Sequence, residues 1–208
     1  MWITTSGGDT YGYGSVVKID IARGAISVGD TSAVDQPMGT PDAPCDTWMA
    51  PYGPNCGTGI NYPSAIANDG TNVWVANTSG LEGIVKINIA TGAVTEIDSS
   101  TFCLPSGVAS TGTDVFVMNT CDGTDGGGSV SQINIATGVV TEIDSSTFND
   151  LLAIATNGTY VWVSNMINYS PSDFSVSQID IATGAVTEID SSTFNSDYYL
   201  AFGAGPSG

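Results

Sequence analysis

The sequence contains no histidine and only 3 lysines and arginines against 21 aspartates and glutamates, so its 208 residues carry a formal net charge of −18. Phosphate groups are bound by clustered Lys and Arg, so this balance argues against nucleic acid and anionic membrane surfaces as partners. No apolar run approaches the roughly 18 residues of a transmembrane helix, so membrane insertion is not expected. Without histidine, a Ser-His or Cys-His catalytic pair is excluded as well.

Cysteine is scarce but even in number, with four residues. The spacing does not match a metal site, so the sequence predicts two disulfides, which favours an extracellular or cell-surface location. Three pairings are possible, and we prefer Cys45–Cys56 with Cys103–Cys121. Asn77, Asn157 and Asn168 begin sequons and are candidate glycosylation sites. No signal peptide is visible at "MWITTSGG", so the sequence either begins after processing or is a segment of a longer protein.

What the chain has in abundance is repetition. "KINIATGAVTEIDSSTF" begins at Lys86, and close copies begin at Gln132 and Gln178, with a fainter one, "KIDIARGAISVGDTS", at Lys18. The spacings are 68, 46 and 46 residues, so the first interval holds an insertion, residues 31–61. Apolar residues alternate, and Asp-Gly, Asn-Gly and Thr-Gly pairs mark turns, which predicts four short strands per unit. A period in the forties predicts an all-β propeller of four-stranded antiparallel blades.

The two ends of the sequence are complementary in this reading. "MWIT" at Met1 matches "VWVA" in the second strand of a unit, and "YLAFGAGPSG" at the C-terminus matches "LLAIATNGTY", the first strand and the turn after it. We therefore expect residues 1–208 to form one propeller domain of four blades, in which N- and C-terminal segments share the last blade. Closure within one chain and closure between chains both satisfy this pattern.

The repeat resembles the YVTN/NHL/streptogramin-lyase-like β-propeller repeats. The words that carry the resemblance are "PSAIANDGTNVWVANT", "LPSGVASTGTDVFVMNT" and "IVKINIATGAVTEI", and it covers almost the whole chain except residues 31–61. It implies the propeller fold. Known members often have six to eight blades, so four per chain departs from the family. The lyase branch uses a catalytic histidine, which this sequence lacks, so that activity is not carried over.

If the family geometry holds, the monotonous turns lie on one face of the ring and the divergent loops on the other, where function is expected. The insertion presents Trp48, Met49 and Tyr52 as candidate binding residues for sugar or protein, or as a small core of its own. Asp122 and Asp125 in "CDGTDGGG" are candidate Ca²⁺ ligands, although such turn carboxylates are more often solvated. No other cofactor is indicated.

Aligned residues in the four units have structural interpretations. Packing between blades accounts for one aromatic residue per unit (Trp2, Trp74, Phe116 and Trp162), and Asx turns account for Asp20, Asn88, Asn134 and Asp180. The regular glutamates Glu96, Glu142 and Glu188 are expected on the outer strand, away from any central cleft.

We therefore expect a non-enzymatic extracellular module for a fibre, surface layer or adhesion, whose partner is itself or a glycan. The alternatives are a carbohydrate- or partner-binding module that uses the loop face, and a carboxylate-dependent polysaccharide or cyclic-peptide lyase or hydrolase.

Overall fold

The computed structural model describes residues 63–78, 83–120, 127–166 and 174–189 with their side chains, and residues 2–5, 15–20, 25–28 and 190 by their backbone alone. Every regular element in these ranges is a β-strand. No helix in the described ranges is long and apolar enough to cross a membrane. The prediction of an all-β chain is therefore confirmed.

The strands form four antiparallel sheets, each a simple meander in chain order. The first sheet has three strands: β1 (Trp2–Thr5), β2 (Ser15–Asp20) and β3 (Ala25–Val28). The second sheet has four: β4 (Pro63–Asn68), β5 (Asn72–Asn77), β6 (Gly83–Asn88) and β7 (Val94–Ile97). The third has four: β8 (Pro105–Ser110), β9 (Asp114–Asn119), β10 (Ser129–Asn134) and β11 (Val140–Ile143). The last has four: β12 (Leu151–Thr156), β13 (Tyr160–Met166), β14 (Phe174–Asp180) and β15 (Val186–Asp190).

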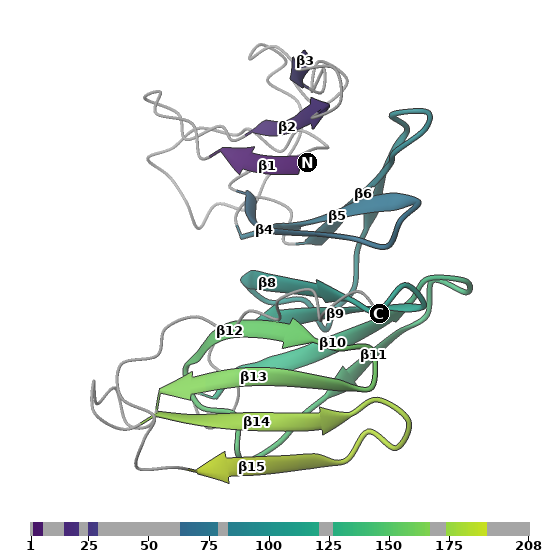
Figure 1. Cartoon of the computed structure of the whole chain (residues 1–208). Coiled ribbons are helices and arrows are strands. Elements are labelled where there is room, and N and C mark those ends of the chain that lie inside the picture. The colour runs from purple at the N-terminus through teal and green to yellow at the C-terminus, as the bar shows by residue number, and fades with distance from the viewer. Residues whose placement is uncertain are drawn as a thin grey trace, which may run out of the picture.

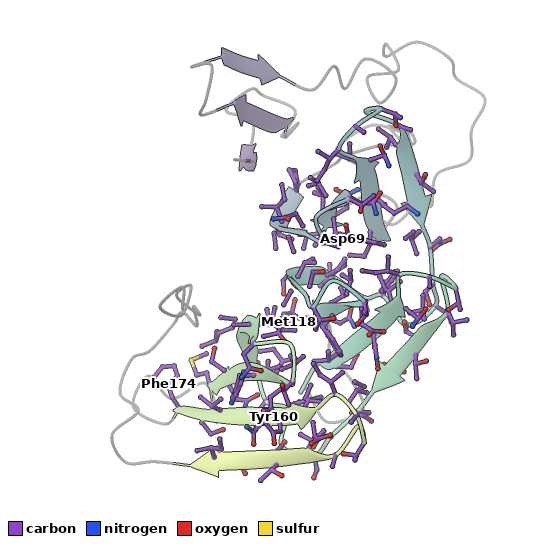
Figure 2. The ribbon with its side chains drawn as sticks, turned by 45° about the vertical axis from the view of Figure 1, so that its right-hand side comes forward. Asp69, Met118, Tyr160 and Phe174 are labelled. Atoms are coloured by element: carbon purple, nitrogen blue, oxygen red, sulfur yellow. The ribbon has the colours of Figure 1, made fainter. Side chains whose placement is uncertain are left out.

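The sheets follow one another along an open arc (Figure 1). Their first strands are neighbours, because β4 contacts β8 and β8 contacts β12. Further contacts join β1 to β4, β5 to β8 and β9 to β12, so two strands of the second sheet and two of the third take part in the stacking. The first and last sheets lie at opposite ends of the arc in both views (Figures 1 and 2).

The backbone register identifies the place of the first sheet in the repeat. Trp74 pairs with Lys86, Phe116 with Gln132 and Trp162 with Gln178, and the first sheet pairs Trp2 with Lys18 in the same way. Strands β1–β3 thus hold the second, third and fourth strand places of a sheet. The residues predicted to supply its first strand, within 191–208, lie outside the described part of the chain. The four-blade count and the shared closure therefore stay predictions.

Most of the described core lies between the sheets, and a smaller cluster lies on one face of the second sheet. Trp74, Ala76 and Ile84 of the second sheet pack on Val115, Val117 and Ile133 of the third in one cluster. In the next cluster Phe116, Met118 and Val130 of the third sheet pack on Val161, Val163 and Ile179 of the last, and Met118 appears between these sheets in Figure 2. Trp74 and Phe116 are fully buried, as expected for aromatic residues that join neighbouring blades.

The repeated turns gather at one end of the sheets. Ile89 N–H donates to the Thr71 carbonyl (2.9 Å), and Ile135 N–H donates to the Thr113 carbonyl (3.0 Å), so the turn after the first strand lies beside the turn after the third. Gly112 in one such turn has φ 91°, a backbone conformation that residues other than glycine rarely adopt. The predicted grouping of the turns at one end is therefore confirmed, and the divergent loops leave the opposite end.

The outer edge of each sheet is its fourth strand, β7, β11 or β15. These strands carry Glu96, Glu142 and Glu188, as predicted, and charge on an exposed edge discourages pairing with another chain. Burial, and then the charge of Asp98, raise the pKa of Glu96 above its usual range. The outer edge is therefore an acidic surface.

Candidate functional site

The turn end of the sheets is held by side chains bonded to their own turns. Asn88 Oδ1 accepts bonds from the backbone N–H of Ala90 (3.0 Å) and Thr91 (2.9 Å), and Asp180 Oδ1 accepts one from Thr183 N–H (2.9 Å). These are the predicted Asx turns, and Asn134 forms the same bond with Thr137. Polar groups at this end are therefore engaged in turn structure.

Asp69 organises the most elaborate of these turns. Its carboxylate accepts bonds from the backbone N–H groups of Thr71 and Asn72, from the Asn72 amide and from the Trp74 indole (2.8 Å). Burial alone would raise the pKa of Asp69, but the bonds from Asn72, Trp74 and Thr71 outweigh it and lower the pKa below its usual value. Lys86 Nζ lies 5.7 Å from the centre of the Trp74 ring, a cation–π contact. This group stabilises the turn end of the second sheet.

A buried polar network lies at the opposite, loop end of the third sheet. Asn119 is 1% exposed and ends β9; its amide donates to the hydroxyls of Ser129 (3.2 Å) and Ser131 (3.0 Å). Ser131 in turn donates to the Thr101 hydroxyl (3.0 Å), and Cys103 N–H donates to Asn119 Oδ1. Thr101 belongs to the segment that leaves β7, so the network ties the second sheet to the third.

The same network recurs one sheet later. Asn165 donates to Ser175 (3.2 Å) and Ser177 (2.9 Å), and Ser177 exchanges a hydroxyl bond with Thr147 (3.0 Å), which follows β11. The second sheet differs, because the register places Gly83 and Val85 where the third sheet has Ser129 and Ser131. The sequence of the preceding segment differs with it, since Ala33 stands where Thr101 and Thr147 stand. A threonine in the segment before a sheet thus occurs together with a serine in the third strand of that sheet, and the second sheet has neither at these positions.

Backbone strain marks the entry to the inner strands. Leu104 (φ 45°) and Asp150 (φ 39°) hold equivalent places, directly before β8 and β12, and are the described residues other than glycine with positive φ. The carbonyl of Asp150 accepts a bond from Met166 N–H (3.3 Å), while its Oδ2 is buried with no hydrogen-bond partner among the described residues. Strain of this kind costs about 1–3 kcal/mol and is common at binding sites. Asp150 is therefore the most unusual carboxylate in the described part of the chain.

The loop before β10 approaches this entry closely. A side-chain carbon added at Gly127 would lie 2.1 Å from the Phe148 carbonyl oxygen, and one at Gly128 would lie 2.5 Å from the Asn119 carbonyl oxygen. Only glycine fits at such distances, so the close contacts require glycine at both positions. Residues 127–128 thus lie close to the segment before β12.

Most residues predicted to form a site lie outside the described ranges: Trp48, Met49, Tyr52, Cys45, Cys56, Cys121, Asp122, Asp125 and Asn168. Binding by the insertion and calcium binding by the two aspartates therefore stay predictions. Within the described ranges, no three Cys, Asp or Glu side chains are grouped as metal ligands.

The remaining predicted residues can be placed. Cys103 is disulfide-bonded, but its partner lies outside the described residues, so the pairing with Cys121 stays a prediction. Asn77 is 1% exposed, which disfavours it as a glycan acceptor in the folded chain. Asn157 lies in an exposed turn, where its Oδ1 accepts bonds from the backbone N–H groups of Thr159 and Tyr160.

Sequence reasoning missed the buried network and the strained aspartate. A signal for the network was present, because Asn ends the second strand of three units and "SVSQI" appears in two. For Asp150 no signal was recognised, since its φ and the burial of its carboxylate are properties of the folded chain.

Consecutive four-stranded antiparallel sheets that pack face to face along an arc define an all-β protein of the β-propeller type. No family model matches the chain, and no curated protein matches it. Solved structures do resemble it in fold. TolB from Acinetobacter baumannii aligns at 13% identity and a TM-score of 0.53 over 85% of this chain and 38% of its own.

Two further structures give the same result. A chain of the nidogen/laminin complex aligns at 8% identity and a TM-score of 0.55 over 90% of this chain and 60% of its own. A putative TolB from Agrobacterium tumefaciens aligns at 13% identity and a TM-score of 0.52 over 86% of this chain and 57% of its own. This chain thus spans 38–60% of the length of these structures, and at such low identities the likeness concerns the fold alone.

Proposed function

We propose that the chain is a non-enzymatic β-propeller module of an extracellular or cell-surface protein, which acts by self-assembly or by binding. The observation that carries the proposal is the use of its polar groups. In the described sheets many of the Asn, Ser and Thr side chains are engaged in turns or in the network between sheets, as in Asn119 with Ser131 and Thr101. The sheets therefore serve as a scaffold with divergent loops at one end. The sequence has no histidine for general acid–base catalysis.

Self-assembly is the leading form of this proposal. The described part of the first sheet has three strands, and this sheet lies at the far end of the arc from the last sheet (Figure 1). A strand from residues 191–208 of another chain would complete it, as edge strands commonly recruit a further strand. Two copies that complete each other would form a closed ring, and an unclosed contact would form a filament.

Light scattering of the full chain over a hundredfold dilution, with and without a calcium chelator, tests the proposal. We expect a mass of two or more chains that decreases on dilution. A monomer at every concentration would overturn the self-assembly form. An effect of the chelator on the mass would support Ca²⁺ at Asp122 and Asp125, and the double variant Asp122→Asn, Asp125→Asn should then remove that effect.

Ligand binding by the loop end is the second candidate, supported by the divergent loops and the strained entry at Asp150. Trp48→Ala should then weaken binding to a glycan array and leave the circular dichroism spectrum unchanged. If the array reports turnover of a glycan instead, the module is an enzyme and the leading proposal fails.

A further inference from the structure

The last sheet has one face that repeats the contact surface of the two sheets before it. In the second sheet this face consists of Ala65, Trp74, Ala76, Ile84 and Ile97, and in the third of Gly107, Phe116, Met118, Val130 and Ile143. The register places Ala153, Trp162, Ser164, Val176 and Ile189 at the same positions of the last sheet. We call these five residues the closing face.

The first two examples of this face are covered by a neighbouring sheet. Ile84 and Val130 are fully buried, and Ile97 and Ile143 pack at the margins of the clusters between sheets. On the closing face, Val176 is only half-buried and Ile189 is 39% exposed. The Trp162 ring lies against Tyr160, with 5.7 Å between the ring centroids. The difference at Val176 and Ile189 is that no described sheet follows the last one.

A polar atom on the closing face also lacks a partner. Ser164 is 3% exposed, and its hydroxyl has no hydrogen bond within the described part of the chain. The third sheet has Met118 at this position and the second has Ala76, neither of which needs a hydrogen bond. A buried hydroxyl without a partner costs about 1–3 kcal/mol, a cost that the last sheet bears at this position and the other two sheets do not.

The surface that covers such a face has a consistent composition. Val115, Val117 and Ile133 cover the face of the second sheet, and Val161, Val163 and Ile179 cover that of the third. The backbone register assigns Ile3 and Ile19 of the first sheet to the positions of Val117 and Ile133, and Val17 to the position of Ser131 on the same face. The first sheet thus offers the sequence of a covering surface at the end of the arc opposite to the closing face.

We propose that the closing face docks on the first sheet of a second copy of this chain, in continuation of the stacking that joins the sheets within each chain. The inference depends on the self-assembly form of the proposed function and names the surface that would perform it. The contact is head-to-tail, because the two surfaces differ and each copy has one of each. The five residues of the closing face carry no charge, so this side of the contact is uncharged.

The test compares Ile189→Asp with Val139→Asp in sedimentation equilibrium of the full chain. Val139 lies in a turn away from the closing face and is 59% exposed, so its variant carries the same charge change off the contact. We expect Ile189→Asp to weaken association at least tenfold and Val139→Asp to leave it within twofold, with unchanged circular dichroism. A chain that assembles but is indifferent to Ile189→Asp overturns this inference alone. A wild-type chain that never assembles overturns the proposed self-assembly as well.

A mixing experiment identifies the partner surface. The Ile189→Asp variant keeps its first sheet, so it should still associate with wild-type chains in a one-to-one complex. If the variant is excluded from wild-type complexes, the closing face meets another closing face, and the assignment of the first sheet is wrong.

Discussion

Replacing the pair Thr101 and Ser131 with the pair that the sequence has at the first junction, Ala and Val, tests whether the hydroxyl network joins the sheets. In wild type the two hydroxyls lie 3.0 Å apart, and Ser131 also accepts a bond from the Asn119 amide (3.0 Å). Ser131→Val removes both bonds, and the weaker one from Ser131 to the Thr101 carbonyl (3.3 Å), in a site that is 0% exposed. Each bond contributes about 1 kcal/mol net, so we expect a loss of about 2–3 kcal/mol in the free energy of unfolding.

Thr101→Ala alone should cost about 1 kcal/mol, because Ser131 keeps its bond from Asn119. The double variant should lose about 1 kcal/mol less than the sum of the single losses, since the bond between the two hydroxyls can be lost only once. Urea unfolding followed by circular dichroism measures all four proteins of the cycle. The equivalent cycle at Thr147 and Ser177, also 3.0 Å apart, is the matched control and should give the same coupling.

Strict additivity in both cycles would refute the reasoning. It would mean that the hydroxyl groups are satisfied independently, and that the coincidence of Thr before a sheet with Ser inside it has no energetic content. A coupling in the third sheet but not in the last would limit the claim to one junction.

Three further predictions concern the core, the turns and the surface charge. Phe116→Ala should cost about 3–5 kcal/mol in urea unfolding, because the ring is fully buried between two sheets, and a loss below about 1 kcal/mol would contradict that packing. Asp69 has a lowered pKa, so its stabilising effect is present above its unfolded pKa of about 4 and disappears as the pH falls through the lower folded value. Wild type should therefore lose more melting temperature than Asp69→Asn between pH 5 and pH 2, and equal losses would contradict the role of the carboxylate. Copies with a net charge of −18 repel each other, so salt should strengthen association measured by light scattering, and weakening by salt would point to charge pairs in the contact.

Much of the fold could be predicted because the repeat carries its own turn chemistry. Thr-Gly and Asp-Gly pairs fixed the places of the turns, and alternation placed Val85 and Ile87 on one face, where they pack together. The predicted four strands per unit are found in the second, third and last sheets. Comparison of four units also identified Trp2 as a second-strand residue, which the register with Lys18 supports.

The site was less predictable because its residues act through packing between sheets. The identity of Asn119 does not reveal whether its amide is buried, and only the neighbouring sheet removes it from water. Asp150 has a positive φ that the identity of an aspartate does not reveal, and Leu104 shares it at the equivalent place of the preceding unit. The sequon at Asn77 shows the same limit, because a surface motif became a buried strand end.

The mass of the full wild-type chain at micromolar concentration and below tests the central claim most directly, namely that this arc of sheets is completed by another copy. The account predicts a complex of two or more chains that Ile189→Asp dissociates, with Val139→Asp unaffected. A single-chain mass for the wild type at every concentration and salt would contradict it.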